Sequence, residues 1–447
     1  MTPDVVACTA SHRLVDGEVR LLGAVSTVTG AMTRVELGGS KLLVDCGIAQ
    51  GKDASSWAFP DAARDVDAVV LTHGHLDHIG SLPHLLDGGF DKPIFATAPT
   101  LDIARISLED ALSMQQRTGF RDTQSVLQAF DRLSRPIAYD QRGPVGGLSL
   151  TFREAGHILG SASVEVASAK SRVILSGDLG RPGAPLLRDP FTAWPSGRPV
   201  DLVVMESTYG EREHEHGHDD IEAKLLAVVQ ETVARKGKVF IPAFAIGRTQ
   251  VILYFLNELV ESGRLPAVPV AVDTPMGLLV TATYSKFQQL YDAKSLHQLA
   301  RGDAPLDFDE LYASRRGSDS ARLRDVPGPM IIIAGSGMLT GGRIVGHLVD
   351  GGLSDERNTL LFAGHQGEGT PGRRIQDAAR SGGSVWLDGQ EVPVRARIDT
   401  LRGLSAHADR KELAAWLRAI PDVRRVALHH GEVSAQRALV TFLAAQA

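Results

Sequence analysis

The stretch Val69-Val70-Leu71-Thr72-His73-Gly74-His75-Leu76-Asp77-His78-Ile79-Gly80 decides the fold. It begins as an apolar strand and then places His73, His75, Asp77 and His78 within six positions. A strand end followed by a glycine-containing loop lets alternate side chains surround one point, so His73 and His75 can face one cation. Asp77 and His78 can then face a second cation ~3.5–4 Å from the first. A polar loop with surface histidines is the alternative, but it gives no reason for four potential ligands at this spacing beside an apolar strand.

The composition indicates an ordinary globular protein. Of 447 residues, 43% are hydrophobic and 22% are charged, which excludes a disordered or collagen-like chain. The longest apolar runs, such as Met330 to Ala334, are far shorter than the ~20 residues that span a bilayer. The first residues, MTPDVVACTA, have neither a basic start nor an apolar stretch. We therefore expect a cytoplasmic protein without a membrane partner.

Cysteine content and charge limit the possible chemistry. Two cysteines, Cys8 and Cys46, are too few for a disulfide framework or a zinc ribbon, so a metal must be held by histidines and carboxylates. The 47 basic and 53 acidic residues give a net charge of −6, which is not typical of a general nucleic-acid binder. Phosphate binding then requires a metal-neutralised site and local arginines.

The hydrophobic pattern changes along the chain. The first two hundred residues, roughly, read as short strands between glycine-rich turns, for example 32–37 and 148–152, with helices between them. From about Ser207, helices alternate with buried strands such as 239–241 and 330–334, as in a Rossmann-like parallel sheet. A helix, a strand and a helix follow between 410 and 445. This order predicts a β-rich layer with helices on it and a Rossmann-like α/β stretch, and it leaves open one large domain with an insertion or two to three separate domains.

The motif at 73–78 resembles the HxHxDH signature of the metallo-β-lactamase superfamily. The resemblance implies an αββα sandwich and assigns further residues. His157, in Ala155-Gly156-His157-Ile158-Leu159-Gly160, would complete the first metal's ligands, and Asp178, in Ser176-Gly177-Asp178, would bridge both metals. Asp45, in Val44-Asp45-Cys46-Gly47, would orient the ligand loop. A single histidine or strand-end aspartate is more often structural, and only the order and context of these three favour a functional role.

Three later motifs resemble the β-CASP ribonucleases of that superfamily, closest to the cleavage-and-polyadenylation endonuclease type and its prokaryotic RNA-processing homologues. Glu206 lies in a motif A (205–210), His407 in a motif B (405–409), and His430 in a motif C (428–432). The resemblance assigns His430, and not the adjacent His429, to the second metal. It implies an α/β fold in which residues 1–208 and 395–447 form the metallo-β-lactamase domain and residues 209–394 form an inserted Rossmann-like β-CASP domain.

Glycine-rich turns follow the expected strands of the insert, at 242–250, 272–277, 335–343 and 367–374. Backbone N–H groups at such turns can hold a phosphate, although glycine also caps helices and closes turns. We expect the following residues to contact substrate phosphates: Ser336, Gly337, Thr340, Arg248, Arg343 and Arg373. For any single arginine, a solvated surface position is the alternative.

The resemblance implies a ribonuclease with two Zn²⁺ ions per chain. A metal-bridging hydroxide would attack single-stranded RNA, His407 and Glu206 would form the proton donor pair, and Asp77 would accept the proton of the nucleophile. Endonuclease and 5′-to-3′ exonuclease action both stay open, as does a homodimer. The alternatives are hydrolysis of single-stranded DNA, of a small-molecule ester or thioester, or a scaffold without activity. The filled ligand positions argue against the scaffold, and the insert argues against a small-molecule hydrolase.

Overall fold

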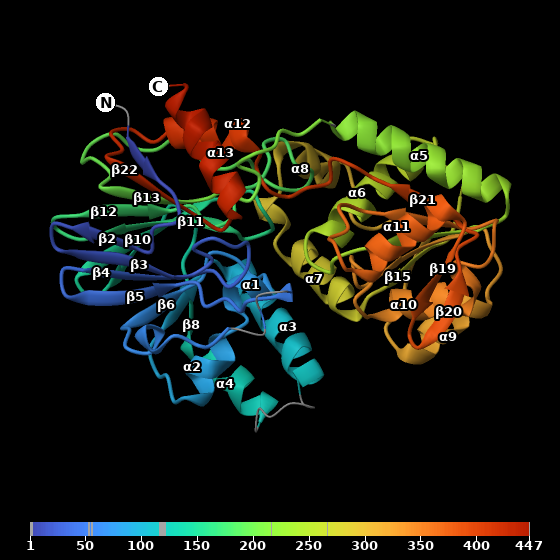
Figure 1. The fold of residues 1–447 in the computed structure, drawn as a ribbon, viewed down its shortest axis with the longest axis horizontal. Coiled ribbons are helices and arrows are strands. Elements are labelled where there is room, and N and C mark those ends of the chain that lie inside the picture. Colours follow the sequence, from blue (N-terminus) through green and yellow to red (C-terminus); the bar gives the residue numbers. More distant parts are fainter. Residues whose placement is uncertain are drawn as a thin grey trace. The chain divides into compact units, whose positions relative to one another are not determined.

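The computed structural model describes residues 3–51, 54, 57–115, 122–215, 217–265 and 267–446. The chain divides into two compact units, the first made of Met1–Glu213 and Ala406–Ala447 and the second of His214–Ser405 (Figure 1). Within the described ranges, no helix combines the length and the apolar character needed to cross a bilayer.

The first unit contains two seven-stranded sheets. One has the order β1 (Asp4–Val6), β22 (Arg425–His429), β13 (Leu202–Glu206), β12 (Arg172–Leu175), β11 (Ala162–Ala167), β10 (Leu148–Glu154), β9 (Arg142–Val145). The other has the order β2 (Ser11–Leu14), β3 (Gly17–Gly23), β4 (Met32–Leu37), β5 (Ser40–Val44), β6 (Ala68–Val70), β7 (Ile94–Ala96), β8 (Ser134–Pro136). Because β1 and β22 pair, the two chain segments share one sheet.

The two sheets pack face to face, with helices on the outer faces. Val35 and Val70 of one sheet meet Val164 and Val204 of the other in a single apolar core. The outer face of the β6 sheet is covered by α1 (Leu76–Ile79), α2 (Leu82–Asp87), α3 (Ala98–Gln115) and α4 (Thr123–Leu133). The outer face of the β13 sheet is covered by α12 (Arg410–Arg418) and α13 (Val433–Ala444) (Figure 1). The predicted αββα sandwich is confirmed.

The second unit is built on a six-stranded sheet whose paired strands are all parallel. The order is β16 (Leu311–Ala313), β15 (Val270–Asp273), β17 (Met330–Ala334), β14 (Lys238–Pro242), β18 (Thr359–Phe362), β21 (Arg397–Thr400). Its helices are α5 (His218–Ala234), α6 (Arg248–Glu261), α7 (Pro275–Lys286), α8 (Ala293–Ala300), α9 (Gly317–Asp325), α10 (Arg343–His347) and α11 (Pro371–Ser381). A hairpin, β19 (Ser384–Leu387) and β20 (Gln390–Pro393), precedes β21. The predicted Rossmann-like α/β insert is confirmed.

The domain limits derived from the motifs stay a prediction. The compact units divide after Glu213 and after Ser405. Residues 395–405, which we assign from the motifs to the returning metallo-β-lactamase domain, fall in the second unit because β21 pairs with β18. The pairing of strands and the positions of motifs therefore define slightly different limits.

Parallel pairing gathers candidate site residues of the first unit at one edge of a sheet. Strands β12, β13 and β22 run parallel to one another, so their carboxyl ends meet at the same edge. Asp178 follows β12, Glu206 is the last residue of β13, and His430 follows β22. Strand β6 in the facing sheet leads directly into His73.

Candidate metal centre

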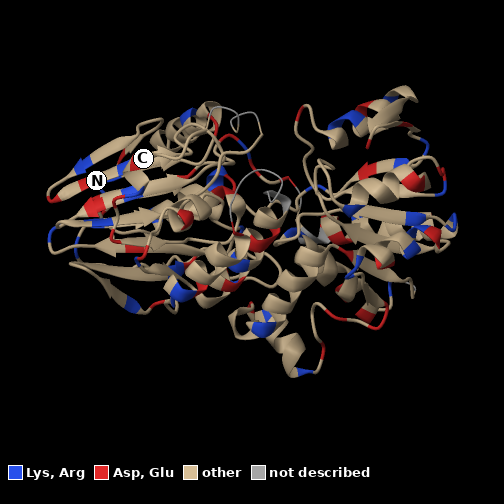
Figure 2. Ribbon diagram, turned by 90° about the horizontal axis from the view of Figure 1, so that it is seen from below, with Lys and Arg blue, Asp and Glu red and all other residues tan. Residues whose placement is uncertain are grey.

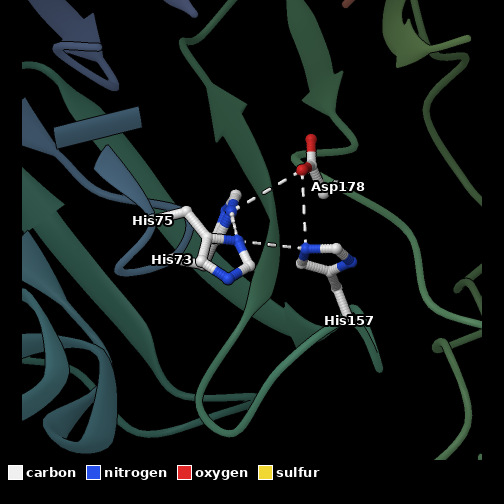
Figure 3. Close-up of side chains that lie close together, drawn as sticks. All are labelled: His73, His75, His157 and Asp178. Atoms are coloured by element: carbon white, nitrogen blue, oxygen red, sulfur yellow. Dashed lines mark hydrogen bonds and ion pairs between the residues drawn. The ribbon is translucent and has the colours of Figure 1, made fainter. Parts of the chain in front are cut away.

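Three histidines and a carboxylate converge in the first unit. His73 and His75 follow β6, His157 lies in the loop between β10 and β11, and Asp178 follows β12. Their ligand atoms lie within 4.8 Å of one another. Figure 3 shows the four side chains directed toward one another. His75 Nδ1 lies 3.1 Å from His73 Nε2 and 3.2 Å from His157 Nε2. Three imidazole nitrogens thus face a common point.

A second group consists of Asp77, His78 and His430. Nε2 of His78 lies 3.2 Å from Nε2 of His430, which is 3.6 Å from Oδ2 of Asp77. His78 and His430 are separated by 352 positions in the chain, and both are buried. The loop after β22 therefore brings the carboxyl-terminal segment to the first helical turn of α1.

Asp178 lies between the two groups, with one oxygen toward each. Its Oδ2 lies 3.6 Å from Nε2 of both His73 and His157. Its Oδ1 lies 3.3 Å from Nε2 of His78 and 3.4 Å from Nδ1 of His430. This arrangement allows a single carboxylate to contact cations in both groups.

The protonation of the first group suits a cation. Burial lowers the pKa of His73 and His157 well below the usual value, so both rings are neutral and offer lone pairs. Burial opposes ionisation of Asp178, but His430 and His78 outweigh it and hold its pKa well below the usual range. Among the described residues, Oδ1 of Asp178 is buried without a hydrogen-bond partner. Facing nitrogen lone pairs and an unsatisfied buried carboxylate oxygen fit a divalent metal ion, because only a cation would satisfy both.

A second layer of hydrogen bonds orients the histidine rings. Asp45 accepts hydrogen bonds from the backbone N–H and the hydroxyl of Thr72, both at 2.8 Å, and lies 2.7 Å from Nδ1 of His78. On the other side, Nδ1 of His157 lies 3.2 Å from the carbonyl oxygen of Ala406. Holding Nδ1 in this way directs Nε2 toward the centre, as in many metal sites. Sequence reasoning missed Thr72, although a hydroxyl directly before the first ligand was a usable signal.

His407 and Glu206 form a pair beside the first group. Nδ1 of His407 lies 3.1 Å from Oε1 of Glu206, which is fully buried. Glu206 also accepts the backbone N–H groups of Leu179 at 2.8 Å and Thr208 at 3.2 Å. Burial opposes protonation of His407, but Glu206 outweighs it and raises the pKa of His407 to about 9. The imidazole is 21% exposed and can therefore meet a ligand.

The two histidines of the last motif have different surroundings. His429, the last residue of β22, is buried, and burial lowers its pKa to about 3. The next residue, His430, has a φ of 48°, which turns the chain at the strand end. Only His430 joins the second group of possible ligands. A neighbour that sequence reasoning missed is Thr208, whose Oγ1 lies 3.2 Å from Nδ1 of His430.

The predicted phosphate-binding residues lie in the second unit, at turns that follow β14, β17 and β18 and at the helices that these turns lead into. After β17, Oγ of Ser336 accepts the backbone N–H of Thr340 at 3.1 Å, and Thr340 is exposed. Gly337 is buried in the same turn. These strands are neighbours in the sheet, so their turns meet at one edge. Contact of these residues with phosphate stays a prediction.

The three predicted arginines differ in how they are held. Arg343 donates to Oδ1 of Asp273 at 2.7 Å and to the carbonyl oxygen of Arg315 at 3.1 Å, so it ties its turn to the sheet. Arg373 donates from Nε to Asp377 at 3.3 Å and is 41% exposed. Arg248 packs its guanidinium against Gly364, where an added Cβ would lie 2.7 Å from one of its nitrogens. Figure 2 shows basic and acidic residues interspersed over both units.

The αββα fold and the buried histidine–carboxylate cluster define a class, the metallo-hydrolases. Residues 27–243 match the family model described as the metallo-beta-lactamase superfamily, and residues 249–375 match the Beta-Casp domain. Residues 391–444 match a Zn-dependent metallo-hydrolase RNA specificity domain.

Two relatives and one solved structure are similar to this chain over more than nine tenths of its length. Ribonuclease TTHA0252 of Thermus thermophilus is 39% identical, over 94% of this chain and 95% of that protein. Transcription termination factor FttA of Methanocaldococcus jannaschii is 32% identical, over 93% of this chain and 67% of that protein. A crystal structure of a protein of unknown function from Enterococcus faecalis shares the fold, with a TM-score of 0.56, 14% identity and coverage of 93% and 94% of the two chains. The chain belongs to the β-CASP ribonuclease family of the metallo-β-lactamase superfamily, whose members are metal-dependent hydrolases.

Proposed function

We propose that this protein is a two-zinc ribonuclease that hydrolyses phosphodiester bonds of single-stranded RNA in RNA processing or decay. The observation that carries the proposal is the convergence of two ligand groups on Asp178, with the His407–Glu206 pair beside them. The ribonuclease among the relatives and the matched RNA specificity domain support RNA as the substrate.

The proposed metal ligands are the two groups already described. His73, His75 and His157 would hold one zinc ion, Asp77, His78 and His430 would hold the other, and Asp178 would contact both. When bound, the zinc ions supply Lewis-acid chemistry, because they lower the pKa of water toward ~7 and neutralise charge on phosphate oxygens. Asp45 keeps Nε2 of His78 directed at its group through the hydrogen bond to Nδ1.

His407 is the proposed proton donor. Hydrolysis leaves a 3′ oxygen that needs a proton, and an imidazole can hold one and release it. Glu206 accepts from Nδ1 and stabilises the protonated ring, which leaves the other nitrogen to serve the leaving group. Asp77 is proposed to accept the proton of the attacking water.

Substrate binding is proposed to use the second unit. Ser336, Gly337 and Thr340 would offer hydroxyl and N–H donors to phosphate oxygens. The arginines Arg248, Arg343 and Arg373 would add positive charge beside these turns.

A direct test uses RNA and single-stranded DNA of one sequence, each labelled at its 5′ end. The zinc-loaded protein is expected to shorten the RNA, and a chelator should abolish the reaction. Internal fragments would indicate endonuclease action, whereas released end nucleotides would indicate 5′-to-3′ exonuclease action. RNA left intact by zinc-loaded protein would contradict the proposal, and faster cleavage of the DNA would favour the single-stranded DNA alternative. Light scattering of the same protein tests whether it forms the homodimer that the sequence leaves open.

A further inference from the structure

An exposed aromatic ring lies among the glycine turns of the second unit. Phe244 follows β14 by two residues and is 49% exposed, while its neighbours Ala243 and Ala245 are buried. Among the described residues of the turns after β14, β17 and β18, no other large hydrophobic side chain is exposed. A lone ring among polar groups is unlike an apolar protein-docking patch, which gathers several such side chains.

The ring of Phe244 rests on the backbone of Gly337. A Cβ added at Gly337 would lie 3.0 Å from both Cδ2 and Cε2 of the ring, closer than side chains normally approach. Any other residue at 337 would therefore displace the ring. Glycine at this place in the turn after β17 keeps the aromatic side chain in its position.

Hydrogen bonds fix both halves of this contact. The carbonyl oxygen of Phe244 accepts the backbone N–H of Thr249 at 3.1 Å and its hydroxyl at 2.8 Å. The carbonyl oxygen of Gly337 accepts Nε2 of the buried Gln366 at 3.1 Å. The ring thus lies on a support built from the turns after three neighbouring strands.

We propose that Phe244 is a stacking platform for one base of a single-stranded RNA substrate. The inference rests on the proposed function and adds a base contact to the phosphate contacts. Proteins that bind single strands combine backbone contacts with aromatic rings on which bases stack, because every base has a flat face. Ser336 and Thr340 lie in the same turn as Gly337. Their hydroxyl groups could therefore donate hydrogen bonds to a phosphate next to the stacked base.

The test uses the full chain after treatment with a chelator, so that RNA binds without being cleaved. Phe244→Leu is expected to weaken binding of a fluorescent single-stranded RNA by about tenfold, within the range measured for base–aromatic stacking. Phe244→Tyr keeps the ring and should bind like the unchanged protein. The matched control is Tyr312→Leu, which removes an aromatic side chain that is 57% exposed on β16 of the same sheet.

A set of RNAs, each lacking the base at one position, identifies stacking itself. At one position the missing base should weaken binding by the unchanged protein but cause no further loss in Phe244→Leu, because both changes remove the same contact. Equal binding by Phe244→Leu and the unchanged protein would overturn the platform. It would also be overturned if, at every position, the loss of binding from the missing base simply added to the loss from Phe244→Leu. If Phe244→Leu does not fold, Phe244→Met, which keeps a flexible apolar side chain without a ring, is measured with the same set of RNAs, and equal binding by this variant and the unchanged protein overturns the proposal. Failure of the unchanged protein to bind or cleave RNA would instead reject the proposed function and the platform with it.

Discussion

At the residue scale, the proposal assigns proton transfer to His407 and metal binding to Asp178. His407 contacts Glu206 at the margin of the ligand groups, whereas Asp178 faces both groups. His407→Ala should therefore retain its zinc and lose about 10²–10⁴-fold in cleavage rate, the usual contribution of general acid–base catalysis. Asp178→Ala should lose both zinc and activity. Elemental analysis and cleavage of end-labelled RNA measure the two effects.

The matched control for His407→Ala is His297→Ala, because His297 is exposed on α8 of the second unit. It should change neither zinc content nor rate. Full activity in His407→Ala would refute the assignment of the proton donor.

Glu154 makes the stability of the first unit depend on pH. Burial raises the pKa of Glu154 to about 8, although the N–H of Gly156 and the hydroxyl of Tyr139 oppose this effect. In the unfolded chain the carboxyl ionises near 4.5, so the free energy of unfolding falls as the pH rises from about 4.5 to about 8. Glu154→Gln removes this loss, which amounts to ~1.4 kcal/mol for each pH unit between the two pKa values. We expect urea unfolding to show the variant gaining a few kcal/mol over the unchanged protein across this range, and parallel pH profiles would contradict the prediction.

At the element scale, the turn after β5 holds the ligand loop. The N–H of Cys46 donates to the carbonyl oxygen of His78 at 2.7 Å, and that of Ala31 donates to the carbonyl oxygen of Asp77 at 2.8 Å. Gly47 lies so close that an added Cβ would be 1.7 Å from the same oxygen of Asp77. A shift of this turn would therefore also move the backbone of Asp77 and His78, two of the proposed ligands.

Gly47→Ala should consequently weaken zinc binding. The new methyl group displaces Asp77 and His78, and disturbance of the groups that orient ligands costs about 10–100-fold in metal affinity. Competition with a zinc-binding dye measures the affinity. Gly317→Ala is the matched control, because a Cβ at Gly317 has no atom within 4 Å. Equal affinities of Gly47→Ala and the control would show that the turn does not hold the site.

At the scale of the whole molecule, the first unit depends on both ends of the chain. Strand β22 lies between β1 and β13, and Leu413 and Trp416 of α12 belong to the core on the outer face of that sheet. The second unit, in contrast, is continuous in the chain and has its own apolar core. We expect residues 214–405 to unfold cooperatively when expressed alone and residues 1–213 not to do so. Circular dichroism melting curves test this, and a cooperative transition of 1–213 would contradict it.

The sequence by itself determined which side chains are candidates for the metal centre. His73, His75, Asp77 and His78 are local neighbours, so strand and loop geometry already predicts that they gather, and the family resemblance added the distant His430. Their roles as ligands stay predictions, but the structure brings all of them together. Sequence periodicity predicted the β-rich layers and the Rossmann-like α/β stretch, and the family resemblance supplied the αββα sandwich and the position of the insert.

Only the tertiary structure decided how these side chains are held and oriented. That the two oxygens of Asp178 face different groups, that Arg343 donates to Asp273, and that Phe244 rests on Gly337 all depend on which strand ends become neighbours. Such contacts join residues far apart in the chain through packing at close range. Spacing within the sequence carries no information on them, because it describes local geometry alone.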